Sequence, residues 1–84
     1  ILSVQLIYDE SKRQTNLAKH GLDFADLDVE FFEASTIVPA KGGRSMAIGE
    51  FKGIIVIAVV VQPLGSEALA IISMRPASSR ERKL

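Results

Sequence analysis

The sequence of 84 residues has no cysteine and a single histidine, and these two shortages exclude much chemistry. Without cysteine there are no disulfide bonds, thiolate metal ligands or cysteine nucleophiles. A zinc site built around His20 would need carboxylates for all its other ligands, which is rare for this metal. We therefore expect no metal site and no other cofactor.

Long apolar runs are also missing. The longest, Ile54 to Val61, is far shorter than the roughly 20 residues that a transmembrane helix needs, so we expect no membrane partner. No signal-peptide pattern is visible, and a reducing cytoplasm is the expected compartment. Glycine-rich phosphate loops and a nucleophile-elbow serine are absent as well. The length predicts one domain over residues 1–84.

The net charge is zero, with ten basic and ten acidic residues, but the charges are segregated along the chain. Such segregation can give a neutral protein one basic and one acidic face. A basic face suits phosphates, and an acidic face suits a basic partner. The basic clusters are Lys12, Arg13, Lys19 and His20, then Arg75, Arg80, Arg82 and Lys83; the acidic block is Asp23, Asp26, Asp28, Glu30 and Glu33.

The first part of the chain predicts one strand followed by two helices. Residues Ser3–Tyr8 favour a strand. A helix over Glu10–His20 is expected between the N-cap Asp9 and the C-cap Gly21. A second helix, roughly Phe24–Glu33, is expected after Asp23. Its apolar face would consist of Phe24, Leu27, Phe31 and Phe32.

The rest of the chain predicts strands joined by short connections. Because short connections require antiparallel pairing, we expect an α+β layer of two N-terminal helices packed on an antiparallel sheet, with a short C-terminal helix. That last helix would begin with a capping box formed by Ser78 and Glu81. The expected segments are strand Thr36–Pro39, loop Ala40–Gly43, strand Arg44–Phe51, turn Lys52–Gly53, central strand Ile54–Gln62 buried on both faces, and strand Glu67–Met74, broken by Pro76.

Several side chains of the first helix are suited to acid–base chemistry or to phosphate binding. His20 is the only imidazole of the sequence and is a candidate general acid or base, although it could simply bind free carbonyls at the helix end. Lys12, Asn16 and Lys19 recur at i, i+4 and i+7, so they share one helix face that could bind phosphate oxygens. The alternative is an ordinary solvated face.

Candidates also lie on the predicted strands. Arg75 ends a strand and is followed by Pro76, which favours bidentate phosphate binding at the rim of the sheet. The alternative is a salt bridge from Arg75 to the acidic helix. Arg44 begins another strand and is expected at the same rim. Glu50 is a candidate base beside it, or else an exposed strand residue.

Three blocks of the sequence form a recognisable set. They are Tyr8-Asp9, Lys12, Asn16, Lys19-His20-Gly21 and Phe24; then Arg44 and Ala47-Ile48-Gly49; then Ile71-Ile72-Ser73-Met74-Arg75, Ala77 and Glu81. Together these blocks resemble the BrnT family of toxins. The resemblance implies ribonuclease toxins of type II toxin–antitoxin operons with a RelE-like fold. It also implies a BrnA-like antitoxin that carries a ribbon-helix-helix DNA-binding domain, neutralises the toxin and, in complex with it, represses the shared promoter.

Together, these observations predict a metal-independent endoribonuclease that cleaves RNA and inhibits translation. Arg75 and Arg44 would stabilise the charge of the phosphorane. His20 or Lys19 would transfer protons, with Glu50 as a weaker candidate base. Lys12, Asn16 and Arg80 would hold the RNA. The acidic second helix is the candidate antitoxin surface, although the antitoxin could instead cover the basic site directly. The expected assembly is a homodimer or a heterotetramer with antitoxin.

Two other functions use the same features. A non-catalytic module could bind RNA or protein through the same cations. A structural subunit could pair through the strand edge at Thr36–Pro39. The enzyme hypothesis requires His20, Arg44 and Arg75 to share one cleft.

Overall fold

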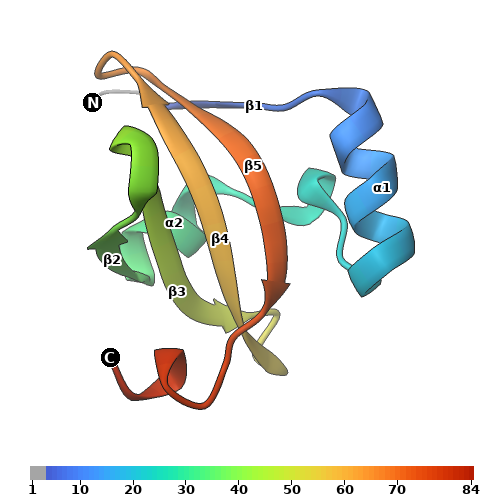
Figure 1. Cartoon of the computed structure of the whole chain (residues 1–84), viewed down its shortest axis with the longest axis vertical. Coiled ribbons are helices and arrows are strands. Elements are labelled where there is room, and N and C mark those ends of the chain that lie inside the picture. The colour runs from blue at the N-terminus through green and yellow to red at the C-terminus, as the bar shows by residue number, and fades with distance from the viewer. Residues whose placement is uncertain (1–3) are drawn as a thin grey trace.

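The computed structural model describes residues 4–84, which form a five-stranded sheet in the order β1-β5-β4-β3-β2 (Figure 1). β1 pairs with β5 in parallel, and every other neighbouring pair is antiparallel. The expectation of a wholly antiparallel sheet was therefore wrong. Short connections determine the pairing only of consecutive strands, and β1 and β5 are far apart in the chain. The strands are β1 (Gln5–Ile7), β2 (Thr36–Pro39), β3 (Ser45–Phe51), β4 (Ile55–Leu64) and β5 (Ala68–Pro76).

Helix α1 (Glu10–His20) has the predicted bounds and caps. A carboxylate oxygen of Asp9 accepts hydrogen bonds from the backbone N–H groups of Ser11 and Lys12, at 2.7 and 3.3 Å. At the other end, Gly21 adopts a left-handed conformation with φ of 70° and donates its N–H to the carbonyl of Leu17 at 2.8 Å. Glycine takes this conformation without steric cost, so the helix ends there. Figure 1 shows α1 beside β5.

The second predicted helix is interrupted. A 3-10 turn, η1 (Phe24–Asp26), is followed by extended backbone at Leu27, and the short helix α2 begins only at Val29 and runs to Ala34. The break has a local cause, because the carboxylate of Asp28 accepts the N–H of Phe31 at 2.8 Å and so caps a new helix. The predicted apolar face is nonetheless confirmed, since Phe24, Leu27 and Phe31 are all buried in the core.

The main core lies between the helices and one face of the sheet, which we call the helix-side face. The opposite face carries a smaller cluster in which Ala77, from the C-terminal segment, packs on Ile48 and Ala58. β4 is the central strand, and Ile57, Ala58 and Val59 are fully buried, as predicted. The prediction was wrong for Ile54, which lies in the turn before β4 and is 85% exposed. The buried residues of the main core are Phe24, Leu27, Phe31, Ala47, Phe51, Ile57, Val59, Val61, Ile71 and Met74.

β5 contains an irregularity that changes which side chains reach the core. Val60 pairs with Ser73 and Val61 pairs with Ile71, so Ile72 is an extra residue, as in a β-bulge. Ile71 and Met74 therefore both reach the main core. Strict alternation along the strand would have placed them on opposite faces.

The remaining boundaries differ from the prediction by a few residues. β4 continues to Leu64, and β5 ends with Pro76 rather than before it. The Ser78–Glu81 capping box is present, with reciprocal bonds of 2.8 and 3.1 Å, but it leads into a 3-10 turn, η3 (Glu81–Lys83). The loop before β3 contains another such turn, η2 (Lys41–Gly43). Of the predicted first strand, Ser3 lies outside the described residues. No helix in residues 4–84 is long and apolar enough to cross a membrane.

Candidate nucleic-acid interface

A groove of about 300 Å³ lies between α1 and β5, and we call it the basic groove. It brings together four residues that the sequence singled out, namely Lys12, Asn16, Lys19 and His20. A second, adjoining hollow, lined in part by Tyr8 and Ala70, shares Lys12 and Ile72 with it. The basic groove therefore continues along β5 towards β1. Its lining residues are Ser11, Lys12, Thr15, Asn16, Lys19, His20, Ile72 and Ser73.

Asn16 holds the two walls of the basic groove together. Its side-chain oxygen accepts the backbone N–H of Met74 at 3.1 Å, and its side-chain nitrogen donates to the carbonyl of Leu22 at 3.1 Å. β1 pairs with β5 only as far as Ala70, so the edge of β5 near Met74 is open to α1. Only 8% of Asn16 is exposed. Because both ends of its amide are used inside the protein, Asn16 positions the groove and does not offer a free amide to RNA.

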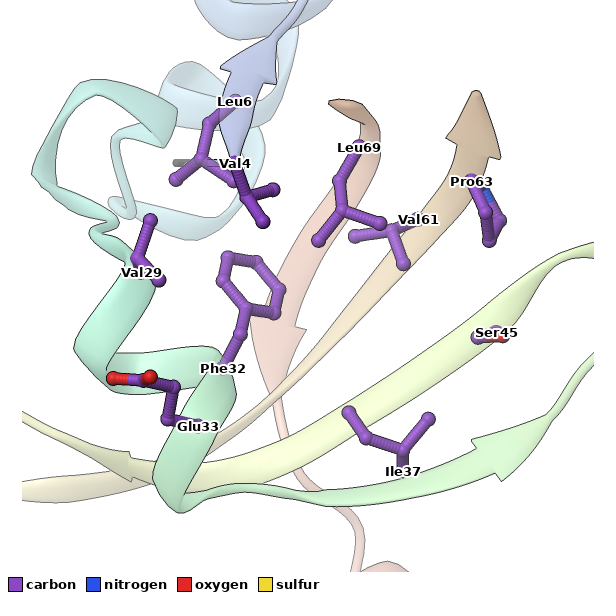
Figure 2. Close-up of a pocket in the computed structure, with 10 residues that line it drawn as sticks. All are labelled: Val4, Leu6, Val29, Phe32, Glu33, Ile37, Ser45, Val61, Pro63 and Leu69. Atoms are coloured by element: carbon purple, nitrogen blue, oxygen red, sulfur yellow. The ribbon is translucent and has the colours of Figure 1, made fainter. Parts of the chain in front are cut away.

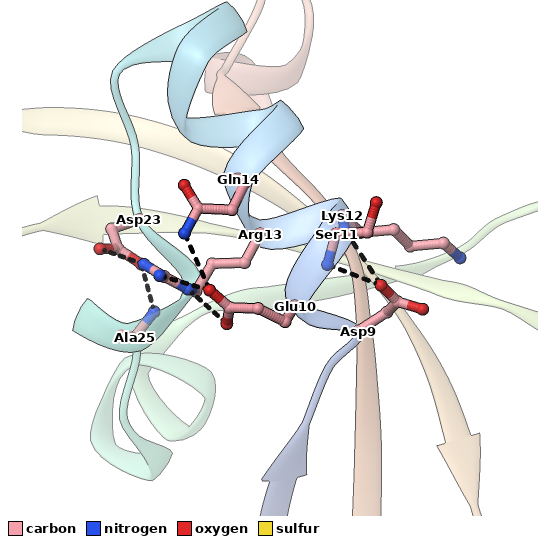
Figure 3. Close-up of polar contacts among 8 residues, drawn as sticks. All are labelled: Asp9, Glu10, Ser11, Lys12, Arg13, Gln14, Asp23 and Ala25. Atoms are coloured by element: carbon pink, nitrogen blue, oxygen red, sulfur yellow. Dashed lines mark hydrogen bonds and ion pairs between the residues drawn. The ribbon is translucent and has the colours of Figure 1, made fainter.

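Arg13 lies on the same helix, but its charge is directed away from the basic groove. Figure 3 shows its guanidinium between Glu10 and Asp23, while Lys12 points away from this network. Two bonds of 2.8 and 2.6 Å join Arg13 to Glu10, and two of 3.0 Å join it to Asp23. The pair with Arg13 lowers the pKa of Glu10 to about 2, and the carboxylates raise the pKa of Arg13. The pKa of Asp23 is lowered, first by the N–H of Ala25 and then by Arg13.

The lysines of the basic groove, unlike Arg13, are not paired with carboxylates in the described part of the chain. Lys12 and Lys19 are exposed, and neither forms a salt bridge within residues 4–84. His20 is half-buried in the last turn of α1 and faces the same groove. Two positive charges and a titratable imidazole are thus available to an anionic ligand at one place.

Arg75 does not line the basic groove. It pairs with Ala58 across the sheet, so its side chain lies on the face opposite the main core. Both terminal nitrogens of its guanidinium bind the carboxylate of Glu81, each at 2.7 Å. This ion pair raises the pKa of Arg75, and with the N–H of Ser78 it lowers the pKa of Glu81 to about 2. The predicted partner, the acidic helix, was wrong; the partner is the C-terminal turn.

Arg44, Glu50 and Arg80 lie elsewhere. Arg44 is exposed just before β3, and alternation places it on the same face as Arg75. Arg75 pairs with Ala58 of β4, which pairs with Ile48 of β3, and Arg44 lies four residues before Ile48. Strand spacing and rise therefore separate Arg44 from Arg75 by roughly 16 Å. Glu50 is six positions further along the chain, roughly 20 Å from Arg44, in a hollow with acidic residues of the α2 side. Arg80 is exposed in the C-terminal segment.

The predicted single cleft containing His20, Arg44 and Arg75 is therefore not found in the described part of the chain. The structure brings together Lys12, Asn16, Lys19 and His20, and it separates them from Arg44, Glu50 and Arg75. The sequence reasoning missed Ser73, whose position in the basic groove follows from the bulge at Ile72. Residues 4–84 contain no group of three or more His, Asp or Glu side chains arranged to hold a metal ion.

This fold and groove define a small α+β protein with a basic groove at the edge of a mixed sheet. A family model described as "Ribonuclease toxin, BrnT, of type II toxin-antitoxin system" matches residues 8–81, and the chain belongs to this family. The structure is also similar to the 1.1 Å crystal structure of the Brucella abortus ribonuclease toxin BrnT, with 61% identity and a TM-score of 0.86. That match covers 92% of this chain and 100% of the other. No curated protein matched the sequence.

Proposed function

We propose that this chain cleaves RNA in the basic groove without a metal ion. The observation that carries the proposal is the separation of its cations: Lys12 and Lys19 are free of acidic partners within residues 4–84, beside His20, whereas Arg13 on the same helix is neutralised by two carboxylates. Membership of a ribonuclease toxin family supports RNA as the anionic ligand.

Metal-free cleavage can proceed through the RNA itself. The 2′-oxygen loses its proton and attacks the adjacent phosphorus, and the bond from phosphorus to the 5′-oxygen breaks as that oxygen takes up a proton. The products are a 2′,3′-cyclic phosphate and a 5′-hydroxyl. His20 and Lys19 would share the two proton transfers. Lys12 would stabilise the negative charge that develops on the phosphorane oxygens, and Ser73 would bind a phosphate oxygen.

The other cations are assigned to the rest of the RNA chain. Arg75 lies two residues beyond Ser73 on β5, so RNA leaving the basic groove would pass over the sheet face that carries Arg75 and Arg44. Arg44 and Arg80 would contact its phosphates. Arg75 is already neutralised by Glu81, and we expect it to hold the C-terminal turn in place. Glu50, on the α2 side, takes no part as a base in this mechanism.

The family also implies an antitoxin, and the finer features of that partner are part of the proposal. We expect a BrnA-like protein with a ribbon-helix-helix domain, bound to the toxin in a heterotetramer that represses the shared promoter. Free toxin would cleave RNA in the cytoplasm and so inhibit translation.

Cleavage of an end-labelled single-stranded RNA in the presence of EDTA tests this function. The wild-type protein should cut and leave cyclic phosphate ends. His20→Ala should lower the rate by about 10²–10⁴, the usual contribution of a positioned acid or base. Lys41→Ala is the matched control, because Lys41 is exposed and lies outside the groove, and it should cut at the wild-type rate.

Two results would contradict the proposal. One is cleavage that disappears in EDTA and returns with a divalent metal, which would require a metal-dependent mechanism. The other is wild-type cleavage by His20→Ala. RNA binding without any cleavage would instead favour the non-catalytic module.

A further inference from the structure

An apolar groove of about 380 Å³ lies on the helix-side face, beside α2 and away from the basic groove. Figure 2 shows Phe32 and Val29 projecting from α2 towards Leu6 and Leu69, with Ile37 of β2 at the other side of the groove. The two grooves share no residue. The apolar groove is lined by Val4, Leu6, Val29, Phe32, Glu33, Ile37, Ser45, Val61, Pro63 and Leu69.

The apolar groove exists because α2 is too short to cover this end of the sheet. α2 has six residues, and its buried side chain, Phe31, packs close to Gly49 of β3. Beyond it, Phe32 and Leu69 are only half-buried, and Ile37 is 54% exposed. Contiguous apolar surface of this kind is typical of an interaction site, because leaving it in water costs free energy.

The charges around the apolar groove indicate the chemistry of its occupant. Among residues 4–84, Glu33 is the only ionisable residue that lines the groove, and no lysine or arginine of this range lines it. α2 also carries Glu30, two residues after its cap Asp28. A complementary partner therefore presents apolar side chains flanked by positive charge.

The shape of the neighbouring strand favours side-chain docking over strand addition. β2 is at the edge of the sheet, but it has only four residues and ends in Pro39. Short edge strands and proline are features that discourage pairing with another chain. An amphipathic helix laid into the groove needs no such pairing.

We propose that the apolar groove is the anchoring site for an amphipathic segment of the antitoxin, whose apolar face fills the groove and whose basic residues meet the acidic α2. The inference takes the existence of an antitoxin from the proposed function, and it adds where the antitoxin binds and through which chemistry. Because the anchor is separate from the basic groove, neutralisation needs a second part of the antitoxin to cover Lys12, Lys19 and His20.

Paired substitutions test the anchor. Ile37→Glu places a charge in the apolar groove, and Ile54→Glu is its control, because Ile54 is a solvent-exposed isoleucine (85%) at the β3–β4 turn. Binding of the purified antitoxin from the same operon is measured by calorimetry. Ile37→Glu should weaken binding by about 10- to 100-fold, the effect of losing one buried aliphatic side chain, and Ile54→Glu should not.

A second pair tests the charge. Glu33→Lys should weaken binding several-fold at low salt and less at high salt, whereas Glu67→Lys, at an exposed site in the β4–β5 turn, should not. All four variants should cleave RNA in EDTA like the wild type when antitoxin is absent. A loss of cleavage would therefore contradict the proposed function and not the anchor, which is tested by antitoxin binding.

The anchor is refuted if Ile37→Glu and Glu33→Lys bind antitoxin as tightly as their controls. It is also refuted if the free wild-type protein sediments as a dimer that Ile37→Glu dissociates, because a second copy of the chain would then occupy the groove. Melting temperatures confirm folding, and Glu33→Lys keeps the test valid if Ile37→Glu does not fold.

Discussion

The two helices are attached to the same sheet in different ways. α1 lies beside β5 and is tied to it by one hydrogen bond, in which the buried amide of Asn16 accepts the N–H of Met74. α2 lies over β3 and is attached by packing, with Phe31 in the core and Gly49 leaving space for it. The outer surfaces differ in the same way, since α1 presents cations to a polar groove and α2 presents acids beside an apolar one.

This difference explains how a chain with zero net charge can have two chemically distinct grooves, one basic and one apolar. A polar attachment lets α1 stay hydrophilic on nearly every side, so its lysines remain available for an anion. An apolar attachment needs aromatic residues on α2, and the helix is too short to bury all of them. The average composition hides this division, because the charges and the apolar groups are sorted by position.

The largest expected effect comes from removing the amide at α1. Asn16→Ala leaves the N–H of Met74 and the carbonyl of Leu22 without their partner, which should lower the free energy of unfolding by about 2–4 kcal/mol. Gln14→Ala, on the exposed side of the same helix, should change it by less than about 0.5 kcal/mol. Urea denaturation followed by circular dichroism measures both. Equal effects would mean that packing, and not the amide, attaches α1.

A smaller effect is expected at the attachment of α2. A Cβ added at Gly49 would lie 3.2 Å from the Cβ of Ser35 and 3.4 Å from Cε1 of Phe31. Gly49→Ala should therefore destabilise the protein by about 1–2 kcal/mol, because α2 must move away from β3. Adding Ser35→Gly removes one of the close atoms, so the double variant should lose less than the sum of the two single losses. Strict additivity would show that the contact does not matter.

The smallest effect concerns a third, ionic attachment, the pair of Arg75 with Glu81. The pKa of Glu81 is lowered from 4.5 to about 2, so the pair stabilises the fold above pH 4.5 and loses this contribution as the pH falls towards 2. At neutral pH, Glu81→Gln should cost about 1 kcal/mol, because the pair is partly exposed. The difference in unfolding free energy from wild type should shrink between pH 4.5 and 2. Glu10 and Asp23 are present in both proteins, so their contributions cancel in this difference. A difference that stays constant with pH would contradict the stabilising pair of Arg75 with Glu81.

Local features of the sequence predicted local structure well. Asp9 and Gly21 mark the two ends of α1 as predicted, because an N-cap carboxylate and a left-handed glycine act through neighbouring residues only. The Ser78–Glu81 capping box formed for the same reason. The spacing of Phe24, Leu27 and Phe31 identified core residues even though the helix containing them is broken, because burial depends on which side of the backbone a residue lies.

Long-range features could not be predicted from these patterns. The parallel pairing of β1 with β5 joins Gln5 to Ala68, and no local signal encodes it. Arg75 was expected to bind phosphate or the acidic helix. Instead it donates two hydrogen bonds to Glu81, which is closer to it in the sequence than the acidic helix is. The positions of Arg44 and Glu50 relative to His20 depended on the strand order, so their shared cleft was wrong while the cluster on one helix face was correct.

The bond between Asn16 and Met74 also has a consequence for the timing of synthesis. The two residues are 58 positions apart, so a ribosome adding about 5–20 residues per second needs roughly 3–12 s to make the second after the first. Until then one wall of the basic groove does not exist. The cleavage site that we propose in this groove can therefore form only after Met74 has been added to the chain.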